Sequence, residues 1–479
     1  MRFISLTICT ALIWLLATYG PLSWAGDRIP TDAAGEAKQV SETQADPEST
    51  IKASPDQSPS VDAGAPATGS SEDSYDGRPA DTGSNVLDRK IDPDGEESSP
   101  TESVENDSAP PLESEATWTL EPEFIHPLTP VQAGRNDSNP VWSPSGQMLA
   151  FERSMGDQRK IVIALRDGTI IKTIYFQTPE EEGALDIFLP GITDTASYNA
   201  GLSWSSRGRS LVFMSNAGSG NYDLYLLPDL DQAQPQRLTR HHGKDCNPQW
   251  SPTGDRLVFV SGSTGKADIF TMDLPSLKSR RITHGKKLYL YPQWSPDGRK
   301  IAMIYGSNEN HDVWVIEDLS APEKSTKTLT TWSYDDLRPV WSPDGSKIAF
   351  YSNFNLQGDQ KLWCIIVVAS DGSDSTSGDA LSAHVVAYQV IPDIEQGPAW
   401  MPDSRHIVYV KNDEQMFNPI YLVDIEERIP VAVQTRTKMN HDISCASDGT
   451  LAFRAQVEQW DHIYIAKIDP EMAAIEELK

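Results

Sequence analysis

Cysteine is scarce in this chain. Only four occur in 479 residues, at Cys9, Cys246, Cys364 and Cys445, and none belongs to a C-x-x-C pair. Cys9 lies in an N-terminal hydrophobic run, so a processed chain would keep an odd number of widely spaced thiols. A disulfide framework is therefore not expected, even in an oxidising compartment. We expect Cys364 and Cys445 to lie in core strands, and Cys246 to lie in a loop where it could be exposed.

Positive charge is also scarce, with 40 Lys and Arg residues against 69 Asp and Glu residues and a formal net charge of −29. No basic stripe is available for a phosphate backbone, which argues against nucleic acid as a partner. A long hydrophobic run occurs once, from Phe3 to Tyr19, and Ser23-Trp24-Ala25 follows it. This pattern predicts a signal peptide over residues 1–25, with an uncleaved anchor as the alternative. The expected location is periplasmic or extracellular, with no membrane segment after cleavage.

Sequence motifs of common enzymes are missing. The chain has no H-E-x-x-H, no P-loop and no Rossmann glycine pattern, and Gly262–Gly265 does not match the G-x-S-x-G nucleophile motif. His241 and His242 with Asp245 form the densest group of metal-binding residue types, but no third ligand is apparent. We therefore expect a non-enzymatic protein without a cofactor.

Residues 26–117 are rich in Ser, Pro, Asp, Glu, Gly and Ala, and Tyr75 is their only aromatic residue. Such a composition cannot bury enough apolar surface to offset chain entropy. It predicts a disordered acidic linker that extends by self-repulsion. Residues 469–479 are expected to form a short C-terminal tail.

What is abundant is a repeated Trp-Ser-Pro-x-Gly element. Successive anchor positions lie 44 to 62 residues apart; the copies at Trp204 and Trp400 are looser, and the copy at Cys445 is degenerate. A period near 45 residues indicates one repeated supersecondary unit. The anchors are Trp142, Trp204, Trp250, Trp294, Trp341, Trp400 and Cys445.

The clearest unit runs from Pro292 to Thr330. A strand ends in a Pro-Asp-Gly turn, and two strands of alternating polarity and a short fourth strand follow. Four short antiparallel strands per unit are typical of a β-propeller blade, so residues 118–468 are predicted to form an all-β propeller. The repeated Trp is expected to pack between blades. Counting motifs gives seven blades, or six if the Cys445 copy is not a full blade. Residues 124–129 resemble a fourth strand and should complete the last blade, which closes the ring.

These repeats resemble those of the TolB-like propeller family. The matching elements are P-x-W-S-P-D-G at Pro339–Gly345, I-A-F at Ile348–Phe350, D-I-F at Asp268–Phe270 and L-T at Leu329-Thr330. The small α/β domain that precedes the propeller of TolB has no counterpart here. The resemblance implies a monomeric propeller that binds a protein or a peptidoglycan-associated envelope partner. Oligogalacturonate lyase has similar repeats, so a carbohydrate-active enzyme is the alternative.

One position suggests a binding surface. The residue five before each anchor is acidic or an amide in six of seven copies, with Tyr289 as the exception. In a propeller this position lies where a loop enters the inner strand, so these side chains are predicted to ring one mouth of the channel. They could contact a basic partner, hold Ca²⁺ through oxygen ligands, or cap their own loops. Partner contact is predicted for Asp137, Asn199, Asp245, Asp336, Glu395 and Asn440, together with Tyr198, Trp332 and Tyr334.

Overall fold

The computed structural model describes residues 119–471 apart from 157, 176–198, 217–220, 233, 308–309, 355–362, 375–383 and 414–416. The predicted signal peptide, the predicted linker and Tyr198 lie outside the described residues, as do residues 472–479 of the predicted tail.

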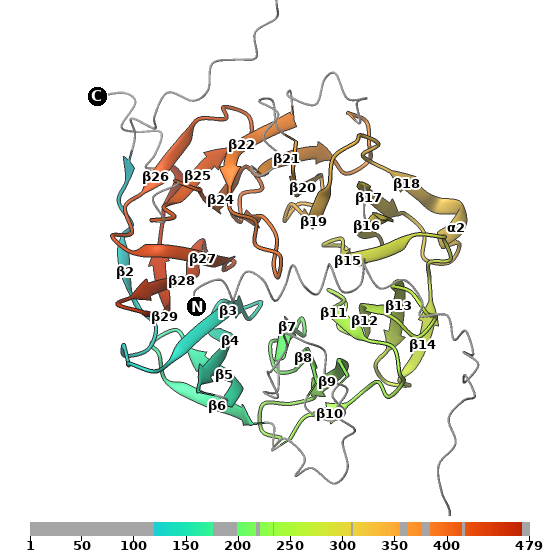
Figure 1. Ribbon diagram of the computed structural model, residues 1–479, viewed down its shortest axis with the longest axis horizontal. Coiled ribbons are helices and arrows are strands. Elements are labelled where there is room, and N and C mark those ends of the chain that lie inside the picture. Colours follow the sequence, from blue (N-terminus) through green and yellow to red (C-terminus); the bar gives the residue numbers. More distant parts are fainter. Residues whose placement is uncertain are drawn as a thin grey trace, which may run out of the picture. The chain divides into compact units, whose positions relative to one another are not determined.

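Seven sheets stand side by side in a ring, each with four antiparallel strands, which follow chain order in blades 1 to 6 (Figure 1). Blade 1 consists of β3(Asn136–Trp142), β4(Met148–Met155), β5(Gln158–Leu165) and β6(Ile170–Tyr175). Blade 2 consists of β7(Asn199–Trp204), β8(Leu211–Ser215), β9(Asp223–Leu227) and β10(Gln236–Arg237). Blade 3 consists of β11(Asp245–Trp250), β12(Arg256–Ser261), β13(Asp268–Asp273) and β14(Lys278–Arg281). Blades 4 and 5 consist of β15(Leu288–Trp294), β16(Ile301–Ser307), β17(Asn310–Ile316) and β18(Thr326–Thr328), with the short helix α2(Pro322–Ser325) before β18; and β19(Asp336–Trp341), β20(Lys347–Ser352), β21(Trp363–Ala369) and β22(Val385–Val390).

Blades 6 and 7 complete the ring with help from the start of the described chain. Blade 6 contains β23(Ala399–Trp400), β24(His406–Val410), β25(Ile420–Asp424) and β26(Pro430–Val433). Blade 7 contains β27(Lys438–Cys445), β28(Thr450–Val457) and β29(Trp460–Lys467). The strand β2(Phe124–Pro127) pairs antiparallel with β29 as the fourth strand of blade 7. The predicted seven-bladed propeller and its closure by an N-terminal strand are thus confirmed, and the six-bladed alternative is wrong. A further strand, β1(Thr119–Leu120), was not predicted; it pairs in parallel with β26 of blade 6.

Local hydrogen bonds explain why the inner strand of a blade ends in a tight turn. In blade 5, Ser342 Oγ donates to Asp344 Oδ1 at 2.6 Å, and the Gly345 amide donates to the Ser342 carbonyl at 2.8 Å. Gly345 has a φ of 73°, a conformation that glycine adopts without strain. The turn reverses the chain directly after the anchor Trp341, so each anchor is placed at the same height in its blade.

The anchors pack between blades, as predicted. Trp341 is buried, and its indole nitrogen donates to the Gln293 carbonyl of blade 4 at 3.2 Å. Trp204 donates likewise to Val141 of blade 1 at 3.0 Å. Cys364 is buried in β21. The expectation for Cys246 is wrong, because this residue belongs to β11 and is only 3% exposed.

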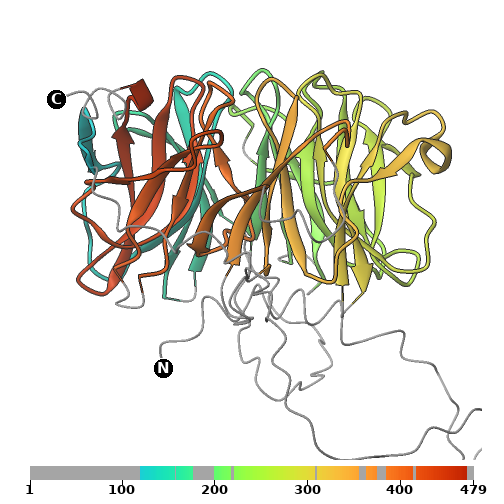
Figure 2. The same ribbon diagram turned by 90° about the horizontal axis from the view of Figure 1, so that it is seen from above.

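The strands run between two faces of the disc, which Figure 2 shows side-on. We call the face with the Trp-Ser-Pro-x-Gly turns the turn face. The opposite face carries the loops that join the outer strand of one blade to the inner strand of the next, and we call it the loop face. Among the described residues, no helix has the length and hydropathy needed to cross a bilayer.

Candidate functional site: the central channel

The side chains predicted to ring the channel mouth are mostly buried. Asp137, Asp245, Asp336 and Asn440 each have an exposed fraction of 0%. They therefore do not form an exposed ring, and as placed they present no surface to a partner. Asn199 begins β7, and Tyr198 precedes it outside the described residues.

Asp336 shows what these positions do instead. Thr330, just after the outer strand of blade 4, donates its hydroxyl to Asp336 Oδ2 at 2.7 Å, and the Trp332 indole donates to Oδ1 at 3.0 Å. Burial raises the pKa of Asp336 to about 8. The carboxyl group thus ties the end of one blade to the start of the next. We call this arrangement the inter-blade lock. Trp332, predicted as a partner contact, is a buried member of it.

Other blades build the lock from different partners. In blade 1, Arg153 makes two bonds to Asp137, at 2.7 and 2.9 Å, and reaches Thr129, just after the outer strand of blade 7, at 3.3 Å. In blade 7, Asn440 accepts from Thr437 and donates to the Asn418 carbonyl, which lies just before β25 of blade 6. Tyr289 is buried against Tyr305, with 4.7 Å between ring centroids. Tyr334 is half-buried and packs edge-on against Phe354. The described side chains thus come closest to the third reading, since they bond to neighbouring groups of the chain, but these bonds join strands and blades and do not cap the residue's own loop backbone.

In blade 3 the lock resembles a catalytic triad but lacks its geometry. His241 Nε2 lies 2.9 Å from Asp245 Oδ2, and the same nitrogen lies 3.4 Å from Ser261 Oγ. A triad needs the carboxylate on one ring nitrogen and the hydroxyl on the other, so that one nitrogen can take the hydroxyl proton while the carboxylate orients the ring and stabilises the imidazolium. Both contacts here use one nitrogen, and Ser261 is buried. This group is structural.

A different set of residues shapes the channel, and four of its seven members line the pocket described below. Three positions before each anchor, the backbone adopts a positive φ between 49° and 86° in all seven blades. In six of the blades a β-bulge interrupts the pairing of the inner strand at this point. A bulge adds one residue to one strand and re-aims the side chains beyond it. We call these residues the bulge ring: Asn139, Gly201, Asn247, Tyr291, Arg338, Gly397 and Asp442.

The bulge ring was not predicted, although the sequence carries a signal for it. Five of its seven members are Gly, Asn or Asp, the residues that tolerate positive φ best. The other two, Tyr291 and Arg338, hold each other, because the Arg338 guanidinium lies 4.6 Å from the centre of the Tyr291 ring. Strained backbone of this kind persists only where the surroundings fix it.

Blade 6 narrows the channel. Its inner strand has only two residues, and residues 391–398 before it form a turn that enters the channel space. The Asp393 carboxylate accepts from the amides of Glu395 and Gln396 at 2.9 and 3.0 Å. Gln396 then reaches across to blade 1 and donates to the Pro140 carbonyl at 2.7 Å, while Arg338 of blade 5 donates to the Ile394 carbonyl. Contacts with blades 1 and 5 therefore fix the turn in place.

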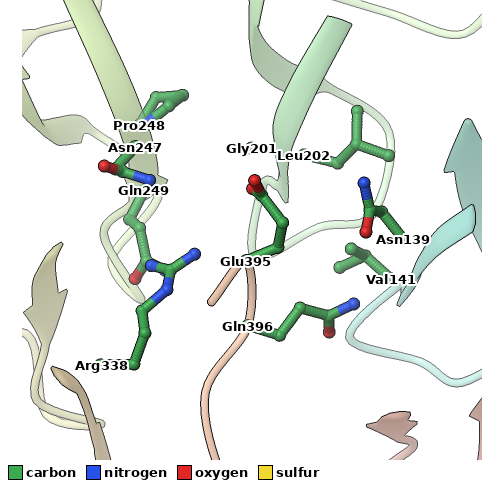
Figure 3. Close-up of a pocket in the computed structure, with 10 residues that line it drawn as sticks. All are labelled: Asn139, Val141, Gly201, Leu202, Asn247, Pro248, Gln249, Arg338, Glu395 and Gln396. Carbon is green, nitrogen blue, oxygen red and sulfur yellow. The ribbon is translucent and has the colours of Figure 1, made fainter. Parts of the chain in front are cut away.

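The space that remains is a polar pocket. Figure 3 shows the Glu395 carboxylate pointing into it, with Gln249 and Arg338 on one side and Asn139 on the other. The pocket holds about 360 Å³, including space open to solvent. Its other lining residues are Val141, Gly201, Leu202, Asn247, Pro248 and Gln396. Glu395 is thus the one member of the predicted acidic set that points into a cavity among the side chains described.

Buried carboxyl groups lie behind this pocket. Burial raises the pKa of Glu152 to about 8, although Asn139 donates to it at 3.0 Å, and the pKa of Asp393 to about 7. Asp442 is paired with Arg454 at 2.8 Å. Among the described residues, no three His, Cys, Asp or Glu side chains are grouped as metal ligands.

Fold and site together define a seven-bladed β-propeller with a polar, partly filled channel. The family described as the TolB β-propeller domain matches residues 191–385, which confirms the predicted resemblance over that part of the chain. The Tol-Pal system protein TolB of one Cereibacter sphaeroides strain is 30% identical over 139 residues, which are 29% of this chain and 26% of that protein. In a second strain it is 42% identical over 72 residues, which are 15% of this chain and 16% of that protein. The chain therefore spans about a quarter or less of these curated relatives.

Two solved structures share the fold. An oligogalacturonate lyase from Vibrio parahaemolyticus has a TM-score of 0.51 at 12% identity and covers 72% of this chain and 94% of its own. An oligogalacturonate lyase in complex with manganese has a TM-score of 0.52 at 14% identity, and the match covers 72% of this chain and 93% of that one. At these identities the likeness concerns the fold alone.

Proposed function

We propose that this chain is an exported, non-enzymatic, monomeric propeller that binds a protein or a peptidoglycan-associated envelope partner at the channel. The observation that carries the proposal is the Glu395 carboxylate, which points into a pocket whose other polar side chains are four amides and the Arg338 guanidinium. Export rests on the signal-peptide pattern of residues 1–25. A protein partner is suggested by the likeness to TolB, whose name places it in the Tol-Pal system.

The lining suits a peptide segment. Asn and Gln side chains both donate and accept hydrogen bonds, so they can pair with main-chain amides of an inserted segment. A Lys or Arg of that segment would form a charge-assisted bond to Glu395. Since the bulges and the 391–398 turn fix these groups on the scaffold, little ordering would be needed on binding.

Capture from an envelope extract tests the proposal. The wild-type protein and a Glu395→Gln variant are immobilised, and retained proteins are identified by mass spectrometry. Glu426→Gln is the matched control, because Glu426 is exposed on the same blade and lies outside the pocket. We expect a partner that wild type and Glu426→Gln retain and Glu395→Gln loses. Equal capture by all three would exclude the channel as the binding site.

The second candidate is a carbohydrate-active enzyme, the alternative that the repeats left open and whose fold the solved oligogalacturonate lyases share. It predicts cleavage of oligogalacturonate with formation of an unsaturated product that absorbs in the ultraviolet. We expect no absorbance increase with or without Mn²⁺. Turnover above the rate of a heat-inactivated sample would replace the binding proposal with the enzymatic one.

A further inference from the structure

Three loop-face loops around blade 3 are basic in an otherwise acidic protein. They comprise residues 240–244 before β11, residues 262–266 between β12 and β13, and residues 284–287 before β15. Together they contain five Lys and Arg residues, three His residues and no Asp or Glu. We call this surface the basic rim.

The three loops form one continuous surface. The Gly262 amide donates to the Lys244 carbonyl at 2.8 Å, which joins the first loop to the second. Lys266 Nζ lies 3.3 Å from the Lys287 carbonyl, which joins the second to the third. Asn221 donates to the carbonyls of His241 and Gly243 and fixes the first loop. The positive groups are therefore held next to one another.

Carboxylates of the same protein balance part of the positive charge of the basic rim. Lys266 pairs with the buried Asp268 at 2.8 Å, His241 lies against the buried Asp245, and His284 Nδ1 lies 3.2 Å from Glu323. In contrast, no carboxylate of the described residues forms a salt bridge with any of four cations of the rim. These four are Arg240, Lys244, Lys286 and Lys287, and all but Lys244 are exposed.

Aromatic rings hold the lysines in place. Lys244 Nζ lies 5.9 Å from the centre of the Tyr222 ring, Lys266 lies 5.4 Å from that of Tyr289, and Lys287 lies 5.9 Å from that of Tyr305. Such contacts restrain the ammonium groups without neutralising them. They also occupy the ring faces on which a sugar would stack. The rim therefore offers fixed positive charge and little aromatic platform.

We propose that the basic rim binds an extended, acidic segment of a protein partner. Neighbouring loops present cations to several carboxylates at once, and a multivalent contact of this kind gains affinity although each exposed pair contributes little. This inference goes beyond the channel proposal. It concerns a separate surface of opposite charge, and it stands or falls independently of Glu395.

The test measures binding of a fluorescein-labelled Glu-Gly repeat peptide to the full chain by fluorescence anisotropy. A Lys-Gly repeat peptide and an oligogalacturonate of similar length are the comparison probes. The triple variant Arg240→Gln, Lys286→Gln, Lys287→Gln removes three rim charges. The control triple variant Arg207→Gln, Lys278→Gln, Arg299→Gln removes the same charge from exposed positions outside the rim.

We expect the Glu-Gly peptide to bind wild type and the control, with affinity that falls as salt rises. The rim variant should bind about tenfold more weakly, since three exposed charge pairs are lost. Circular dichroism confirms that both variants fold. No binding by wild type, equal loss in both variants, equal binding of the Lys-Gly peptide, or preference for the oligogalacturonate would each overturn the proposal.

Discussion

At the scale of single residues, a position rich in carboxylates holds buried structural side chains in four blades, whereas Glu395 at the same position points into the channel pocket. Asp336 and Asp137 are buried and belong to hydrogen-bond networks that join neighbouring blades: Asp336 accepts from Thr330 of blade 4, and Asp137 accepts from Arg153, which also donates to Thr129 just after β2 of blade 7. Sequence alone shows that a short polar residue recurs five positions before each anchor. It does not show whether that residue faces water, because a buried lock and an exposed ring need the same residue types.

The lock predicts a specific pH dependence. Since the pKa of Asp336 is about 8 in the folded protein and 3.8 is its ordinary value, the folded state holds a proton that the unfolded state releases between about pH 4 and pH 8. Stability contributed by this proton is fully present below that window and falls as pH rises through it. Asp336→Asn cannot titrate. The free energy of unfolding of wild type relative to this variant should therefore decrease, by roughly 1–4 kcal/mol, between pH 4 and pH 8.

Urea unfolding of both proteins at several pH values checks this. Other titrating groups are shared, so they cancel in the difference. A difference that stays constant, or that increases with pH, would show that Asp336 is ionised in the folded protein.

At the scale of elements, the repeat was predicted and the bulge was missed, although Gly, Asn or Asp recurs at its position. Pro, Asp and Gly set the turn after each anchor through local chemistry, so the sequence alone was enough to predict the strands and the blade count. Strand alternation would place residues five, three and one before an anchor on one face. In β19 the extra residue between Leu337 and Val340 breaks that pattern, so Arg338 lines the channel and Asp336 enters the lock. Pairing across strands decides this, and sequence periodicity does not reveal it.

The turn before β23 should be sensitive to its glycine. Gly397 has a φ of 86°, and an added Cβ would lie 2.6 Å from Val340 Cγ2. Gly397→Ala should lower the free energy of unfolding by about 2–4 kcal/mol, because backbone strain and a packed neighbour act together. Gly134→Ala is the control, since Gly134 has a φ of 81° and an added Cβ would have no atom within 4 Å. That variant should lose only about 1 kcal/mol.

Chemical denaturation of the two glycine variants measures the difference between them. The same loss in both would mean that residues 391–398 can shift without cost, and the pocket beside Glu395 would then not be rigid.

At the scale of the whole molecule, stability depends on how the ring closes. The strand β2 is paired over four residues with β29, and the buried Leu128 follows it. The strand β1 adds only two pairs to β26, with Leu120 buried beneath. No sequence pattern marks such a short parallel strand, whereas β2 was recognisable because blade 7 lacked a fourth strand. Loss of β2 should therefore lower the stability of the fold more than loss of β1 does.

Two shortened chains test this difference. A chain that begins at Pro122 lacks β1 and should lose about 2 kcal/mol, in proportion to the burial of Leu120. A chain that begins at Thr129 also lacks β2, which leaves β29 as an open edge that favours association. We expect it to melt at a clearly lower temperature and to form oligomers. Thermal unfolding with size-exclusion chromatography compares them, and equal behaviour would show that β2 is dispensable for closure.

The order of these two strands along the chain has a mechanical consequence. A pulling force applied from the N-terminal side reaches β1 at Thr119 before it reaches β2 at Phe124. The two pairs with β26 would separate first and lengthen the chain, while the strand that closes the ring carries no extra load. Under tension, the pairing of β1 with blade 6 would therefore break before the pairing of β2 with β29, which keeps the ring of blades closed.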